Sequence, residues 1–152
     1  MENLVLKLIA SNLTISSCES LTAGMFSSQL ASVPNASKTL LGAIVSYNNL
    51  IKEKVVNIDK SIIDEKGVVS SEVAFLMAKN TKEIMHSDIC VSFTGNAGPS
   101  GMENKPVGLV YSCIYFNDSK FFVYENKYDG NRQQIRQACI DDIVNKLSEI
   151  LG

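Results

Sequence analysis

Histidine and excess positive charge are both scarce in this sequence. Only one histidine, His86, occurs among 152 residues, and it lies where a helix is expected to end, which favours a C-terminal capping role. The 14 Lys and Arg residues are outnumbered by 16 Asp and Glu residues, so the net charge is −2. The single histidine disfavours a His-based catalytic dyad or triad, and the charge balance argues for no nucleic-acid partner.

Cysteine spacings typical of metal or redox sites are also absent. The four cysteines are scattered at positions 18, 90, 113 and 139, and no C-x-x-C pair occurs. Cys18 lies beside the candidate site described below, but no histidine lies near it in the sequence to activate it. We therefore expect four reduced, packed thiols and no metal site.

Long apolar runs and targeting signals are lacking as well. No run approaches the roughly 20 residues that span a bilayer, so we expect no membrane contact. The N-terminus has neither the basic start nor the small-residue cleavage site of a signal peptide, and a cytoplasmic location is expected. With 45% hydrophobic and 20% charged residues, the chain fits one domain, residues 1–152, with a sizeable core.

Helical and strand patterns alternate along the chain. Helices are expected at 2–11, 21–32 and 48–56, after Asp59, from Ser70 and after Asn131, with strands at 13–17, 40–46, 89–93, 108–116 and 121–128. The nearly all-apolar run 40–46 is typical of a strand covered on both faces. The order predicts an α/β fold, a three-layer α/β/α sandwich with a mostly parallel mixed sheet.

Polar residues follow three of the expected strands. They are the junction 18–24, which contains Ser20 and Thr22, the segment 46–52, and the glycine-rich turn 94–101. Open α/β sheets bind ligands at the carboxyl ends of their strands. If the three strands are neighbours, one crevice collects Ser20, Tyr47, Lys52 and Thr94.

Each of these features also has a purely structural interpretation. Ser20 and Thr22 are suited to cap a helix, and a lysine in a Lys-Glu-Lys segment is usually solvated. In this interpretation Tyr47 packs its ring locally, and the glycine-rich turn is simply a tight connection. Taken singly, the structural interpretations are favoured; three polar strand ends in one small domain together favour a binding crevice.

Hydrolysis by an activated hydroxyl is the chemistry that fits these residues. Ser20 is a weak nucleophile until a base removes its proton, and without a usable histidine a neutral Lys52 is the natural base. The backbone N–H groups just after Ser20, where a helix is expected to start, are suited to hold an oxyanion. Glycines in the turn 94–101 let backbone N–H groups approach a phosphate closely.

Several ordered motifs resemble one known family. They are Glu-Ser-Leu-Thr-Ala-Gly at 19–24, Val-Ser-Tyr-Asn-Asn-Leu-Ile-Lys at 45–52, Gly-Val-Val-Ser-Ser-Glu at 67–72, Thr-Gly-Asn-Ala-Gly-Pro at 94–99, Lys-Pro-Val-Gly at 105–108, and Gly-Asn-Arg at 130–132 with Arg136. The series resembles the CinA C-terminal domain family, whose stand-alone members include nicotinamide mononucleotide deamidases.

The resemblance implies an activity and a set of roles. The implied reaction hydrolyses the carboxamide of nicotinamide mononucleotide, a small nucleotide, to nicotinic acid mononucleotide and ammonia, in a homo-oligomer and without metal or other cofactor. Ser20 matches the nucleophile, Lys52 the general base and Tyr47 a third catalytic group, while Arg132 is expected to meet the phosphate. The residues expected to bind substrate are Thr22, Gly24, Thr94, Gly95, Ala97, Gly98 and Arg132.

The chain departs from the family pattern at three pocket positions. Ala23 replaces a glycine, Leu50 stands where the family has an acidic residue, and Asn96 replaces an apolar residue. None removes a proposed catalytic group. An alternative function therefore stays open, in which the chain is a catalytically silent family member that binds a nucleotide or a protein.

Overall fold

The computed structural model describes all 152 residues, arranged as five strands, six α-helices and one short 3-10 helix. The strands are β1 (Ile15–Glu19), β2 (Leu40–Val45), β3 (Ile89–Gly95), β4 (Leu109–Asn117) and β5 (Lys120–Lys127). The helices are α1 (Glu2–Ala10), α2 (Met25–Ala31), η1 (Ala36–Lys38), α3 (Asn49–Lys54), α4 (Lys60–Lys66), α5 (Ser71–Met85) and α6 (Arg132–Ile150).

The strands form one sheet in the order β2-β1-β3-β4-β5. Strand β1 lies between β2 and β3 and is parallel to both, whereas β4 runs antiparallel to β3 and to β5. The predicted mixed sheet is confirmed, although only two of its four pairings are parallel. Because β1 to β3 run the same way, their carboxyl ends lie at one edge.

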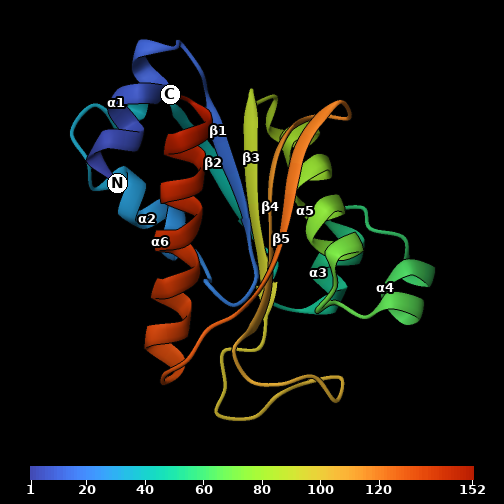
Figure 1. The fold of residues 1–152 in the computed structure, drawn as a ribbon. Helices are drawn as coiled ribbons and strands as arrows, with labels where there is room; N and C mark the ends of the chain where they lie inside the picture. Colours follow the sequence, from blue (N-terminus) through green and yellow to red (C-terminus); the bar gives the residue numbers. More distant parts are fainter.

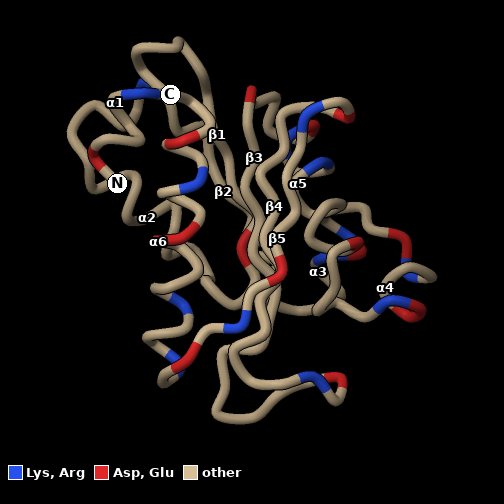
Figure 2. Tube along the Cα trace, viewed as in Figure 1, with Lys and Arg blue, Asp and Glu red and all other residues tan.

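Helices cover both faces of the sheet, which confirms the predicted α/β/α sandwich. Helices α1, α2 and α6 lie on one face, and α5 lies on the other with α3 and α4 beside it (Figure 1). Charges of both signs are interspersed along the chain (Figure 2). None of the helices is long and apolar enough to cross a membrane.

Helix caps follow the chemistry expected from the sequence. The side chains of Asp59 and Ser70 accept hydrogen bonds from the first turns of α4 and α5. His86 is the C-cap of α5, with the left-handed backbone (φ 57°) typical of that position. All four cysteines are free and buried, as expected.

The prediction that residues 40–46 form a strand covered on both faces is wrong. Strand β2 lies at the edge of the sheet, and Leu41 and Val45 are 49% and 47% exposed. A continuous apolar run indicates a buried strand only when the strand has neighbours at both edges and helices over both faces. Strand β2 pairs with β1 at one edge and has no neighbouring strand at the other.

The helix expected at 21–32 begins later, at Met25. The preceding residues form two consecutive turns, in which Ala23 N–H donates to Ser20 O (3.0 Å) and Met25 N–H donates to Thr22 O (2.9 Å). Ala23 and Gly24 both have positive φ, at 46° and 94°, a conformation that an α-helix does not contain. Ser20 therefore ends a strand and begins a turn rather than capping a helix.

Candidate active site

Ser20, Ser46 and Thr94 lie at equivalent levels of three neighbouring strands. Glu19 pairs with Val45 on one side and with Phe93 on the other, so the next residue of each strand is at the same edge. Ser20 N–H donates to Phe93 O at 3.0 Å, which fixes the serine against β3. The turn after β3 and the start of α6 lie at this same end of the molecule (Figure 1).

A buried lysine contacts the hydroxyl of Ser20. The two atoms, Lys52 Nζ and Ser20 Oγ, are 3.0 Å apart, and Nζ also donates to Ser46 O at 2.5 Å. Asn48 caps α3 by accepting from Leu50 N–H, and this short helix directs Lys52 back beneath the sheet edge. Lys52 is only 1% exposed, which excludes the solvated surface lysine that its sequence neighbours favour.

Burial also changes the protonation of this lysine. Removal from water lowers the pKa of Lys52 from 10.5 to about 8, because the ammonium form loses its hydration. Nearby groups oppose this effect, among them the carboxylate of Glu103, without cancelling it. A primary amine with this pKa is neutral in an appreciable fraction near neutral pH and is able to act as a general base.

A cavity of about 140 Å³ opens beside Ser20. Arg132 spans its rim, donating from Nη1 to Gly98 O (2.6 Å) and from Nη2 to the Tyr47 hydroxyl (2.7 Å). Of the predicted site residues, those lining this cavity are Ser20, Tyr47, Gly95, Ala97, Gly98 and Arg132. Asn96, which the sequence placed at the pocket as a departure from the family pattern, also lines the cavity, and the lining residues not predicted from the sequence are Leu21, Ser100 and Met102.

Three predicted binding residues lie outside this cavity. Thr22 is fully buried, and its hydroxyl has no hydrogen-bond partner. Gly24 lines a separate shallow hollow together with Ala23. The Thr94 hydroxyl donates to Val68 O at 2.7 Å, so this side chain holds the loop before α5.

The N-terminus of α2 is already occupied by an acidic side chain of the protein, Glu19. The buried Glu19 carboxylate accepts from Phe26 N–H (2.9 Å) and Ser27 N–H (3.1 Å), and the Ser17 hydroxyl also donates to it (2.9 Å). These contacts satisfy the donors that the first turn of a helix leaves free. Phe26 and Ser27 N–H are therefore not free to hold an oxyanion, and the N–H groups directly after Ser20 stay the expected donors.

Asn96 organises the glycine-rich loop from inside. Its amide group contacts three backbone carbonyls and accepts from Met102 N–H (3.1 Å), and the side chain is almost fully buried. An apolar side chain at this position makes none of these bonds. The asparagine that departs from the family pattern thus stabilises the wall of the cavity.

Two positions of this loop require glycine for different structural reasons. A Cβ atom on Gly95 would lie 2.5 Å from Leu109 O, so only glycine permits the close approach of β4. Gly98 has φ +86°, a conformation that disfavours other residues. The close packing of the chain on itself, rather than contact with a phosphate, explains Gly95.

Ala23 occupies a strained backbone conformation. Its φ of 46° lies in the left-handed region, which costs a residue with a Cβ atom about 1–2 kcal/mol relative to the right-handed one. Its side chain faces the separate hollow rather than the Ser20 cavity. The methyl group therefore does not narrow the Ser20 cavity.

We expect Ala23→Gly to raise the free energy of unfolding by about 1 kcal/mol, because glycine adopts positive φ without strain. Urea denaturation followed by circular dichroism measures the change. Ala138→Gly, in the interior of α6, serves as the control and is expected to lower stability by a similar amount. A destabilised Ala23→Gly variant would contradict the strain assigned to this turn.

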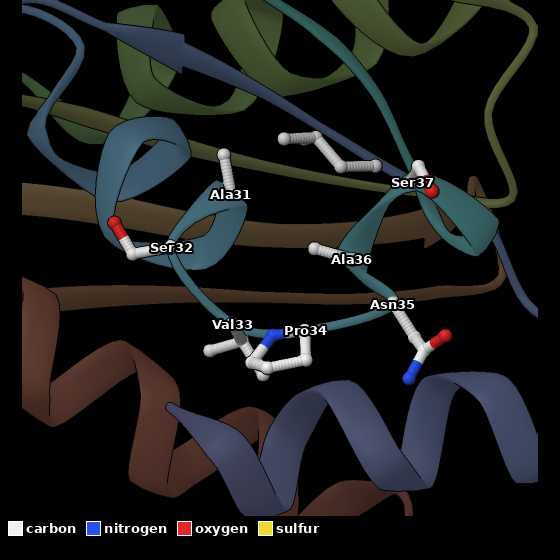
Figure 3. A pocket seen from close by; sticks show the side chains of 8 residues that line it. Ala31, Ser32, Val33, Pro34, Asn35, Ala36 and Ser37 are labelled. Carbon is white, nitrogen blue, oxygen red and sulfur yellow. The ribbon is translucent and has the colours of Figure 1, made fainter.

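A larger hollow of about 530 Å³ lies elsewhere, at the segment that joins α2 to β2. Figure 3 shows that its side chains come from one continuous stretch of chain, residues 31–37. Leu40 completes the lining, and the hollow contains no acidic, basic, cysteine or tyrosine side chain. It offers no acid–base pair, so the smaller cavity beside Ser20 is the candidate active site.

Known proteins share both the sequence pattern and this fold. A family model described as the CinA C-terminal domain matches residues 1–151. A CinA-like protein of Petrotoga mobilis is 44% identical over 133 residues, which are 87% of this chain and 33% of the relative. A CinA-like protein of Thermosipho melanesiensis is 38% identical over 141 residues, 91% of this chain and 35% of the relative. The chain thus spans about a third of the length of the curated relatives it matches.

Solved structures show the same architecture. The competence/damage inducible protein CihA from Agrobacterium tumefaciens has a TM-score of 0.91 and 26% identity, covering 99% of this chain and 95% of that one. A CinA superfamily protein from Enterobacter cloacae has a TM-score of 0.94 at 22% identity, covering 99% and 89% of the two chains. With the family match extending over nearly every residue, the chain belongs to the CinA C-terminal domain family.

Proposed function

We propose that the chain is an amidohydrolase that converts nicotinamide mononucleotide to nicotinic acid mononucleotide and ammonia. The observation that carries this proposal is the 3.0 Å contact between the Ser20 hydroxyl and the buried Lys52 amine, at the wall of a cavity. A serine paired with a desolvated lysine is a nucleophile paired with its base. The substrate is that implied by the family resemblance.

The proposed reaction has two acyl-transfer steps. Neutral Lys52 accepts the proton of Ser20 as Oγ bonds to the carboxamide carbon, and the tetrahedral intermediate forms. Lys52 then returns this proton to the departing nitrogen, so that ammonia leaves and an ester to Ser20 remains. Water attacks the ester with the same proton path, releasing the carboxylate and restoring the serine hydroxyl.

The carbonyl of Ser46 orients the lysine for this task. One N–H of Lys52 donates to Ser46 O at 2.5 Å, which holds Nζ beside Ser20. When the amine is neutral, its lone pair is left to accept the serine proton. With a pKa of about 8, about a tenth of the lysine is neutral at pH 7.

The size and charge of the cavity suit one end of a nucleotide. Its volume of about 140 Å³ is below the roughly 300–1,000 Å³ of pockets that enclose a whole drug-sized ligand. We place the pyridine carboxamide inside and the ribose phosphate along the rim. Arg132 and the exposed Tyr47 lie at this rim, and a guanidinium group binds phosphate well.

Ammonia release from nicotinamide mononucleotide, compared with nicotinamide riboside, tests the proposal. The nucleotide is expected to be the better substrate, and Arg132→Met is expected to raise KM for the nucleotide roughly 10- to 100-fold, the value of a charged hydrogen bond. KM for the riboside should change little. Lys127→Met removes an exposed cation elsewhere and is the matched control.

Two results would contradict this assignment. An equal rise in KM for the nucleotide and the riboside in Arg132→Met would contradict a contact between Arg132 and the phosphate. Tight binding of the nucleotide in calorimetry, without ammonia release by the unmodified chain, would favour the silent binding module instead.

The homo-oligomer implied by the resemblance stays a prediction. The surface that supports it is the outer edge of β2, which contains no charged residue or proline and leaves backbone groups unpaired. Edge strands usually carry charged residues or proline, which prevent pairing with another chain. The other edge strand, β5, has lysines at both ends.

A further inference from the structure

The turn after Ser20 contains buried donors without partners. Leu21 and Thr22 are 3% and 0% exposed, yet neither N–H group is paired with a backbone acceptor. The nearby carboxylate of Glu19 is already taken by the first turn of α2. The Thr22 hydroxyl, buried as well, lacks a partner too. Buried donors are rarely left unpaired in proteins, and Leu21 lines the Ser20 cavity, so the N–H groups of Leu21 and Thr22 mark a place where an acceptor binds.

The carbonyl groups of Ser20, Leu21 and Thr22 are, in contrast, all paired. Ser20 O accepts from Ala23 N–H at 3.0 Å. Leu21 O accepts from Arg136 Nε at 2.8 Å, and Thr22 O accepts from Arg136 Nη2 at 3.2 Å. A third nitrogen of this guanidinium, Nη1, donates to the side chain of Gln133 (3.1 Å). One side chain of α6, distant in sequence, thus holds two successive carbonyls of the turn.

Fixing a carbonyl also fixes the N–H group of the following residue. A peptide unit is planar and trans, so its C=O and N–H bonds point in opposite directions. The bond from Arg136 to Leu21 O therefore sets the direction of the Thr22 N–H. The Ala23 bond to Ser20 O sets the direction of the Leu21 N–H in the same way.

A planar guanidinium is suited to this role. Its donors form a rigid fork that engages two acceptors at fixed angles, whereas a lysine ammonium is a flexible point charge. Arg136 is also one of only two arginines in the chain, and the other, Arg132, spans the cavity rim four residues earlier. The two arginines of α6 thus have separate contacts, one with the rim and one with the turn.

We propose that Arg136 is a positioning residue for the reaction at Ser20: by holding the Leu21 carbonyl it orients the free Thr22 N–H toward the oxyanion of the tetrahedral intermediate. By holding the Thr22 carbonyl it also fixes the Ala23 N–H, whose bond to Ser20 O in turn orients the free Leu21 N–H. The proposal rests on the proposed amidohydrolase function. The donors are the N–H groups expected directly after Ser20, since Glu19 occupies those of the first turn of α2. Arg136 itself does not contact the substrate.

Kinetic constants of Arg136→Met distinguish positioning from simple attachment of α6. Loss of one oxyanion donor lowers kcat by roughly 100- to 1,000-fold, and we expect about 100-fold here with KM for nicotinamide mononucleotide unchanged within about twofold. Arg136→Lys, which holds one carbonyl, should give an intermediate kcat. Lys146→Met, on the same helix and away from the turn, is the control and should retain wild-type kcat.

A tetrahedral probe gives a second readout that does not require turnover. Pyridine-3-boronic acid accepts the Ser20 oxygen at boron, and the serine proton passes to Lys52, which gives an anionic tetrahedral adduct visible by boron-11 NMR. The wild type and Lys146→Met should form this adduct. Arg136→Met should bind the probe at least about 10-fold more weakly, because the adduct resembles the oxyanion, and Ser20→Ala should form none.

The possible results separate this proposal from the proposed function. Ammonia release with an unchanged kcat in Arg136→Met, or a loss confined to KM, would overturn the role of Arg136 and leave the amidohydrolase intact. If the wild type releases no ammonia but forms an adduct that Arg136→Met weakens, the positioning role of Arg136 is supported and the proposed substrate is contradicted. Failure of the wild type in both assays would overturn both proposals. Circular dichroism and thermal unfolding of each variant establish that it is folded, and Arg136→Lys provides the test if the Met variant is not.

Discussion

Ser20→Ala is expected to lower kcat for ammonia release from nicotinamide mononucleotide by roughly 10⁴-fold or more, as loss of the nucleophile does in other serine hydrolases. The reason is that alanine has no atom able to form the ester with the acyl group. Neither neighbouring candidate replaces it. Burial raises the pKa of the Cys18 thiol, and the Thr22 hydroxyl lies outside the cavity.

The fold should survive this substitution. The side-chain bond that Ser20 makes is with Lys52, which keeps its bond to Ser46 O. We expect the free energy of unfolding to change by less than about 1 kcal/mol. Ser32→Ala, which also removes a hydrogen-bonded serine hydroxyl, is the matched control and should retain full activity. Turnover that persists in a folded Ser20→Ala variant would contradict the assignment of Ser20 as the nucleophile.

Lys52→Met is expected to reduce kcat by roughly 10³-fold or more, because no other base contacts Ser20. In the unmodified chain kcat/KM should rise with pH and level off above about 8, since the neutral amine is the active form and the pKa of Lys52 in the free protein is about 8. Lys54→Met, which removes an exposed lysine from the same helix, should leave the pH profile unchanged. A profile without this inflection would contradict the assignment of Lys52 as base.

The same lysine should make stability depend on pH. Its pKa is about 8 in the folded chain and about 10.5 when unfolded, so between these values the unfolded chain binds more protons. Stability therefore rises with pH across this window. The shift corresponds to about 3 kcal/mol, which the unmodified chain should gain relative to Lys52→Met between pH 8 and 10.5. Urea denaturation of both proteins at several pH values measures this difference, and parallel curves would contradict it.

The order of secondary structure and several residues that line the candidate site could be predicted from the sequence. Alternating helical and strand patterns are local, and they identify a three-layer sandwich. Polar groups at the ends of strands are unusual enough to mark Ser20, Tyr47 and Lys52 as candidates. The one arginine expected at the rim, Arg132, lies there in contact with Tyr47.

Several features could not be predicted because they depend on strand order and burial. Strand β1 lies between β2 and β3, and this order alone brings Ser20 against Lys52. The edge position of β2 exposes residues that its apolar sequence suggests are buried. The lowered pKa of Lys52 likewise follows from the layers around it and not from its Lys-Glu-Lys neighbours.

The sequence by itself determined which chemical groups stand at the end of each strand, because this depends on residue type and local pattern. Only the tertiary structure decided which of them act together. The Glu19 side chain caps α2, and the Thr94 side chain bonds to Val68 O. Arg136, from the C-terminal helix, contacts the turn after Ser20. The physical reason is that hydrogen-bond partners and desolvation are set by contacts between segments distant in sequence.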